Sequence, residues 1–147
     1  MTHAPHSRRQ VVLGGLLLAS GSLLGACSAD QNAASDPLRV SLEEGRQLFE
    51  AHQARLIDIR ETDEHATGVA DGATLLPMSQ LNQRVKEIPN DPSQPVLIIC
   101  NTQNRSSKVA QALKDAGWSN VRYVHGGMSS WAKNGWPIVK PGAAGRS

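Results

Sequence analysis

The chain has 147 residues, enough for one ordinary domain and too few for two. Charged residues make up 19% of the sequence and hydrophobic residues 39%, a composition that supports a packed core and excludes wholesale disorder. The formal net charge of +2 is concentrated at the amino end: without Arg8 and Arg9, 13 of the 15 basic residues remain against 13 acidic ones. A neutral body with no basic stripe argues against a nucleic-acid partner.

Residues 1–26 are predicted to be a signal peptide. Residues 11–26 carry no charge, and as a helix they would rise about 24 Å, short of a hydrocarbon core of about 30 Å. A basic stretch, a short apolar segment and small residues before a cleavage site are typical of an exported leader. The segment Ser7-Arg8-Arg9-Gln10-Val11-Val12 also resembles a twin-arginine signal, so twin-arginine and general secretory export both remain open.

Cys27 directly follows the apolar segment, and Leu24-Gly25-Ala26-Cys27 resembles a bacterial lipobox. The resemblance implies that the Cys27 thiol takes a diacylglycerol and anchors the protein to a membrane. Residues 27–36 are then a lipidated cysteine and a flexible tether. The expected location is a bacterial cell membrane, facing the periplasm or the exterior. The alternative is an incidental cysteine in a cleaved leader or in a membrane anchor.

Helices and strands alternate through the rest of the sequence. The predicted elements are a helix from the N-cap Ser41 to about His52, a strand at 55–59, a loop with one helical turn at 62–72, a short strand at 74–76, a helix at 80–88, a strand at 95–100, a helix at about 106–116, a strand at 121–124 and a final helix after Gly126-Gly127. Short-range alternation of this kind predicts a single α/β domain with a parallel sheet.

Cys100 is the candidate reactive residue, because it ends the most apolar predicted strand just before a helix. Ligands of open parallel sheets bind beyond the carboxyl ends of the strands. The loop Asn101-Thr102-Gln103-Asn104-Arg105 can turn its backbone N–H groups and the positive end of the helix toward one anion. A sulfur at that point becomes a thiolate more readily, and Arg105 adds a permanent charge at the rim. A buried, inert cysteine is the alternative.

Four further residues are weaker candidates. Asp58 ends its strand on the same side of the sheet as Cys100, so an Asp58–Arg60 pair bracing the loop and a solvated strand end are both open. His65 and His125 either line the rim of the cleft or are merely exposed or capping residues. No histidine pair has the spacing of metal ligands, so neither a metal nor a cofactor is expected.

Four segments in the right order resemble the rhodanese-like sulfurtransferases over about residues 38–139. They are Leu56-Ile57-Asp58-Ile59-Arg60, Gly68-Val69-Ala70-Asp71-Gly72-Ala73, Cys100 through Arg105-Ser106, and Gly126-Gly127-Met128 followed by Trp131. The resemblance implies a five-stranded parallel sheet between helices, a rhodanese-like domain at 37–140 and a disordered tail at 141–147. It also implies that Cys100 is the catalytic cysteine and carries the transferred sulfur as a persulfide.

Two departures from the family pattern affect the expected chemistry. The family loop often has glycine where this chain has Gln103, so Gln103 would be strained if the loop requires a positive φ there. Members that prefer thiosulfate tend to carry a second basic residue in the loop, but Asn101 and Thr102 are neutral. The Cys-x4-Arg spacing is one residue shorter than the Cys-x5-Arg of related phosphatases, and the tighter ring favours a single sulfur atom over a tetrahedral oxyanion.

The expected function is therefore transfer of a sulfane sulfur from a donor such as thiosulfate, a polysulfide or a persulfide. The acceptor would be a thiol or a cyanide-like nucleophile, with a protein acceptor left open. Cys100 would be the nucleophile, Asn101, Thr102, Gln103 and Asn104 would bind the anion, and Arg105 would orient the donor. The alternative is a catalytically silent rhodanese module that binds a partner, or carries or senses sulfur, through the same loop.

Overall fold

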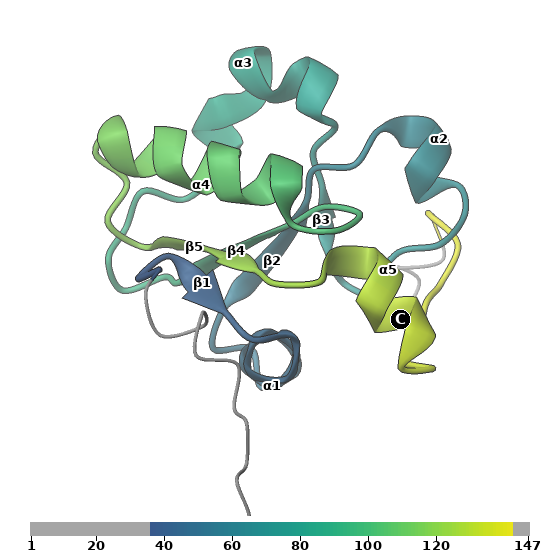
Figure 1. Cartoon of the computed structure of the whole chain (residues 1–147). Coiled ribbons are helices and arrows are strands. Elements are labelled where there is room, and N and C mark those ends of the chain that lie inside the picture. Colours follow the sequence, from purple (N-terminus) through teal and green to yellow (C-terminus); the bar gives the residue numbers. More distant parts are fainter. Residues whose placement is uncertain (1–35, 143–147) are drawn as a thin grey trace, which may run out of the picture.

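A computed structural model describes residues 36–142 (Figure 1). The predicted signal peptide, Cys27, residues 28–35 of the tether and residues 143–147 of the predicted tail lie outside the described residues. The elements in chain order are β1 (Arg39–Val40), α1 (Leu42–Glu50), β2 (Arg55–Asp58), α2 (Thr62–His65), β3 (Thr74–Leu75), η1 (Met78–Gln80), α3 (Leu81–Arg84), η2 (Val85–Glu87), β4 (Val96–Ile99), α4 (Asn104–Asp115), β5 (Val121–Val124) and α5 (Gly127–Lys133).

The strands form one five-stranded sheet in the order β1-β5-β4-β2-β3, and every neighbouring pair is parallel. The predicted parallel sheet between helices is thereby confirmed. β4 is central, and all four of its residues are buried, because helices cover both faces of the sheet. β1, which has two residues, is absent from the predicted elements.

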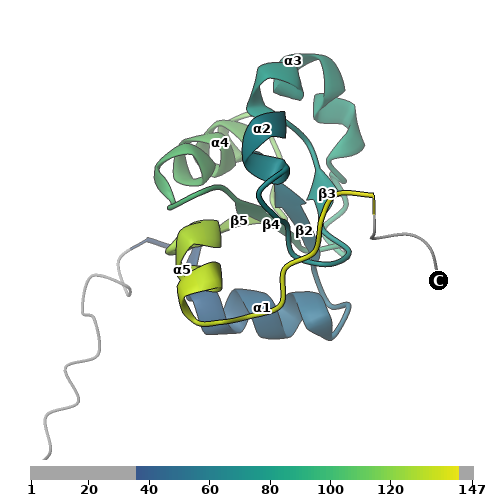
Figure 2. The same ribbon diagram turned by 90° about the vertical axis from the view of Figure 1, so that its right-hand side faces the viewer.

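Helices cover the two faces of the sheet in separate pairs. Figures 1 and 2 show α3 and α4 on one face and α1 and α5 on the other. Successive residues of β4 point to opposite faces, so Ile98 packs in the same cluster as the α4 residue Val109, and Leu97 in the same cluster as the α5 residue Trp131. Cys100 belongs to the cluster on the α4 side.

Two helices differ in detail from the predicted ones, and the predicted cap of a third is present. The predicted helix at 80–88 is one α-helical turn between two 3-10 turns. α4 begins at Asn104, two residues earlier than predicted, which shortens the loop after Cys100. At α1, the Ser41 hydroxyl accepts a hydrogen bond from Glu44 N at 3.1 Å, as predicted, and the Glu44 carboxylate lies 3.1 Å from Arg122 Nη1.

The described chain starts with a firmly held residue. One carboxylate oxygen of Asp36 accepts a hydrogen bond from the Tyr123 hydroxyl at 2.7 Å, and the other accepts one from Leu38 N at 2.9 Å. These bonds lower the pKa of Asp36, the Tyr123 bond having the largest effect. Within residues 36–142, no helix has both the length and the apolar character needed to cross a membrane.

Candidate active site

Cys100 lies in the turn between β4 and the amino end of α4. Its side chain is turned inward, and the residue is only 1% exposed. Ser106 N donates a hydrogen bond to Cys100 Sγ at 3.4 Å, and Sγ donates to Ser106 Oγ over the same distance. Because Ser106 is in the first turn of a 12-residue helix, the sulfur lies at the end of the helix that carries partial positive charge. The thiol therefore lies against the amino end of α4.

The amino end of α5 holds the loop from its other side. Met128 N donates to Cys100 O and Ser129 N to Asn101 O, each at 2.8 Å. The Ser129 hydroxyl also bonds to Asn101 Oδ1 at 2.8 Å. In a trans peptide the carbonyl and the next N–H point in opposite directions. The N–H groups of Asn101 and Thr102 are therefore directed away from α5.

Gly127 allows this close approach of α5 to the loop. Its φ is +59°, and a Cβ added there would lie 2.2 Å from Thr102 O and 2.5 Å from Cys100 O. Both distances are far below van der Waals contact. A side chain at position 127 would therefore displace the backbone that surrounds the thiol.

Gln103 adopts a φ of −152°, so the loop requires no positive φ there and the residue is not strained. The residue occupies the N-cap position of α4. Its side-chain oxygen accepts a hydrogen bond from Gly126 N at 3.2 Å. The glutamine thus ties the loop to the turn before α5, a contact that a glycine could not make.

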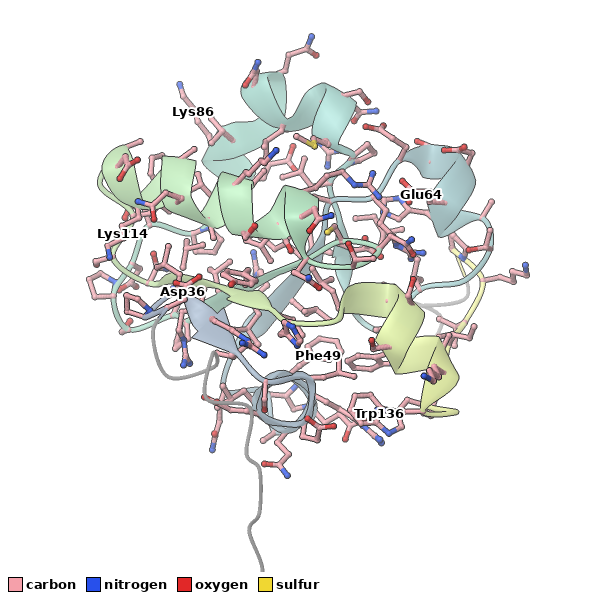
Figure 3. All side chains as sticks on the ribbon, in the orientation of Figure 1. Asp36, Phe49, Glu64, Lys86, Lys114 and Trp136 are labelled. Carbon is pink, nitrogen blue, oxygen red and sulfur yellow. The ribbon has the colours of Figure 1, made fainter. Side chains whose placement is uncertain are left out.

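Arg105 makes a two-pronged ion pair with Glu64 of α2. Arg105 Nη1 lies 2.7 Å from Glu64 Oε2 and Nη2 lies 2.6 Å from Oε1. The hydrogen bond from Arg105 is the main cause that lowers the pKa of Glu64 to about 2, and the same bond raises the pKa of Arg105. Figure 3 shows Glu64 on α2, beyond the amino end of α4. The sequence predicted the arginine at the rim but not its partner.

Asp58 and Arg60 form a buried pair, so the solvated strand end was the wrong alternative. Arg60 Nη2 lies 2.7 Å from Asp58 Oδ2, and Arg60 Nε lies 3.0 Å from both carboxylate oxygens. The guanidinium also donates to Gly68 O at 2.8 Å and to Glu64 O at 3.3 Å. The Asp58–Arg60 pair therefore holds the segment that carries Glu64. Because Glu64 is paired with Arg105, the Asp58–Arg60 pair also helps to position Arg105.

The two histidines lie in different surroundings. His65 is buried; its Nε2 atom lies 3.4 Å from Asp58 Oδ1 and makes no hydrogen bond with any residue from 36 to 142. His125 is half-buried and lines a separate cavity of about 380 Å³ with Arg39 and Ser130. Among the described side chains, no group of three His, Cys, Asp or Glu residues is placed to hold a metal ion.

A cavity of about 230 Å³ adjoins the loop and offers a place for part of a substrate. Asn101, Ser129 and Thr67 supply polar groups to its wall, and Met128 and Ile138 supply apolar ones. A larger cavity of about 420 Å³ is lined by Arg55 and Pro95. Because these two residues are at the amino ends of β2 and β4, that cavity is at the opposite end of the strands from Cys100.

The described residues thus form an α/β domain with a cysteine at the carboxyl end of the central parallel strand, beside the amino terminus of a helix. The model of the family described as the rhodanese-like domain matches residues 41–134. The chain therefore belongs to the rhodanese-like domain family.

Relatives and solved structures agree with this membership. A sulfurtransferase of Allochromatium vinosum is 35% identical over 96 residues, which cover 65% of this chain and 88% of that protein. A rhodanese-related protein from Thermoplasma volcanium superposes with a TM-score of 0.61 at 27% identity, over 69% of this chain and 96% of that one. The thiosulfate sulfurtransferase from Pseudomonas aeruginosa gives a TM-score of 0.61 at 30% identity, over 69% of this chain but only 20% of that one.

Proposed function

We propose that this protein is a sulfurtransferase that carries sulfur as a persulfide on Cys100. The observation that carries the proposal is the position of Cys100 Sγ, 3.4 Å from Ser106 N in the first turn of α4. Membership of the rhodanese-like family and the sulfurtransferase named among the relatives support it.

The first half-reaction moves one sulfur atom onto the enzyme. The Cys100 thiolate attacks the outer sulfur of the donor, a new S–S bond forms, and the bond from that sulfur to the rest of the donor breaks with its electron pair. Thiosulfate would leave as sulfite, and a persulfide as the thiolate. In the second half-reaction a thiolate or cyanide attacks the outer sulfur of the enzyme persulfide and regenerates the Cys100 thiolate.

The loop supplies the stabilisation that this chemistry needs. In this proposal, backbone N–H groups of residues 101–105 and the amino end of α4 stabilise the anionic outer sulfur, as an oxyanion hole stabilises its oxygen. Arg105 lies at the rim of the loop in its ion pair with Glu64. The buried Asp58–Arg60 pair holds this rim in place without touching the reacting atoms.

A catalytically silent module is the second candidate, because Cys100 is only 1% exposed. Reactive cysteines are generally at least partly accessible. In this alternative the same loop binds a partner and no sulfur is transferred.

Intact-mass measurement separates the two candidates. The reduced protein is incubated with thiosulfate or with inorganic polysulfide, and the experiment is repeated with Cys100→Ser. We expect the unmodified protein to gain the mass of one sulfur atom and the variant to gain none. Subsequent addition of cyanide should remove the added sulfur and produce thiocyanate. A protein that stays unloaded with both donors is the silent module.

We also propose that a lipid on Cys27 holds this domain at the outer side of a bacterial membrane. The support is the sequence alone: Cys27 directly follows an uncharged segment and precedes a polar tether. The anchor does not alter the chemistry proposed for Cys100.

A further inference from the structure

The positive charge of the loop is already neutralised within the fold. Residues 101–105 contain a single charged side chain, Arg105. Both of its terminal nitrogens are hydrogen-bonded to the Glu64 carboxylate, at 2.6 and 2.7 Å. A two-pronged pair of this kind satisfies the face of the guanidinium that would otherwise grip an anionic ligand.

Several contacts hold Glu64 in this position. Glu64 Oε2 also accepts a hydrogen bond from Glu61 N at 2.9 Å, and Glu64 O accepts one from the buried Arg60. The two paired side chains are about one third exposed, 33% for Arg105 and 29% for Glu64. With a pKa of about 2, Glu64 stays ionised at any physiological pH, so the pair persists under working conditions.

The other charged side chains near Arg105 add little attraction for an anionic donor. Glu61 and Asp63 both precede Glu64 in the sequence, so three carboxylates lie within four residues. The nearby Arg60 is neutralised by Asp58, with Nη2 2.7 Å from Oδ2. Lys108 is exposed on the second turn of α4, and Lys140 Nζ donates a hydrogen bond to Ala66 O at 2.9 Å, just after α2; Glu61 and Asp63 match these two cations in number. A donor with two negative charges therefore meets little net attraction here.

We propose that Glu64 sets the class of sulfur donor, so that the site accepts a persulfide of low charge in preference to the thiosulfate dianion. This inference rests on the proposed sulfur transfer at Cys100. In the transfer, the Cys100 thiolate attacks the outer sulfur of R–S–S⁻, the S–S bond of the donor breaks with its electron pair, and R–S⁻ leaves while Cys100 becomes the persulfide. Glu64 is a positioning residue, since it acts by holding Arg105 and does not touch the sulfur.

The test compares Glu64→Gln with Asp63→Asn, a matched variant that removes the same charge from the same helix. The probes are thiosulfate and the persulfide of 2-mercaptoethanol, each with cyanide as the acceptor. We expect the unmodified protein to have the higher kcat/KM with the persulfide. Glu64→Gln should raise kcat/KM for thiosulfate relative to the persulfide by about tenfold, mainly through KM, because Arg105 is freed to bind the dianion. Asp63→Asn should change this ratio less than about twofold.

A measurement on the unmodified protein keeps the inference open to refutation even if Glu64→Gln folds poorly. In the unmodified protein, kcat/KM for thiosulfate should vary less than about twofold between low and physiological ionic strength, since screening acts on uncompensated charge. In the double variant Glu64→Gln with Arg105→Gln, the donor ratio should return to the unmodified value. A higher kcat/KM of the unmodified protein with thiosulfate, or an unchanged ratio in a folded Glu64→Gln protein, would overturn the inference. Failure of both donors to load Cys100 would instead overturn the proposed function.

Discussion

Gln103 links two parts of the site, because it occupies the N-cap position of α4 and its side-chain oxygen accepts a hydrogen bond from Gly126 N. Since its φ is −152°, glycine at this position would relieve no strain. We expect Gln103→Gly to lower the free energy of unfolding by about 1–2 kcal/mol, from the lost hydrogen bond and the more flexible backbone. Urea denaturation measures this change. The neighbouring exposed Thr102→Gly isolates the backbone contribution, about 0.5–1 kcal/mol. Stabilisation by Gln103→Gly would contradict the observed geometry.

The Glu64–Arg105 pair gives stability a defined pH dependence. The folded pKa of Glu64, about 2, is below its ordinary value of 4.5, so the pair contributes fully above about pH 4.5 and loses its contribution as pH falls toward 2. At pH 7 we expect Glu64→Gln to lower the free energy of unfolding by about 1 kcal/mol, a value that allows for solvent screening. The difference between the two proteins should shrink between pH 4.5 and 2.5. A difference that is constant over that range would show that the ion pair does not stabilise the fold.

At the scale of elements, the close contact between α5 and the loop after β4 determines the shape of the site. Gly127→Ala should lower the free energy of unfolding by more than about 3 kcal/mol and abolish sulfur loading, since its Cβ would meet Thr102 O at 2.2 Å. Gly135→Ala is the matched control: its φ is +67°, and nothing lies within 4 Å of the added Cβ. The control should cost only about 1 kcal/mol, for the left-handed backbone. Thermal unfolding and intact mass measure both effects. Equal effects of the two substitutions would mean that the contact with the loop is unimportant.

The elements that formed as predicted are those whose sequence pattern is set by burial. The strand of β4 is continuously apolar because both its faces are covered, and β5 was predicted with its observed bounds of 121–124. The helix at 80–88 was predicted from three apolar residues at helical spacing, but that spacing does not distinguish an α-helix from a series of single turns. Local pattern thus predicts which face is buried better than it predicts helical regularity.

Only those residues of the site that lie close to one another in the sequence were predicted. Cys100 and Arg105 are five residues apart on one turn, so the loop could be read from the chain directly. Glu64 is 41 residues before Arg105, and their pairing depends on how α2 is placed by the buried Arg60. The one available signal was that Glu64 follows β2, whose carboxyl end lies at the same edge of the sheet as Cys100. Ser106, which is hydrogen-bonded to the sulfur, is adjacent to Arg105, but nothing in the sequence around it indicated that contact.

At the scale of the whole molecule, the parallel sheet separates the expected anchor from the site. Asp36 lies just before β1 and is held by Tyr123, so the chain enters at the amino ends of the strands. Cys100 follows the carboxyl end of β4. Figure 3 accordingly shows Asp36 and Glu64 on opposite sides of the molecule. A tether of nine residues from Cys27 extends about 30 Å at most, so a lipid on Cys27 would be joined to the domain at the end of the strands opposite the Cys100 loop.

Cys27→Ala tests this arrangement. Two or three acyl chains, at about 0.8 kcal/mol per buried methylene, bind a membrane firmly, and without the thiol no diacylglycerol can be attached. We expect the variant either to appear in the soluble fraction or to remain as a longer, unprocessed precursor, as judged by membrane fractionation and electrophoretic mobility. Cys100→Ser is the control and should fractionate like the unmodified protein. Because the loop is distant from Asp36, the purified Cys27→Ala protein should still load one sulfur on Cys100. Unchanged fractionation and mobility of Cys27→Ala would exclude the lipid anchor, and loss of sulfur loading would show that the two cysteines act together.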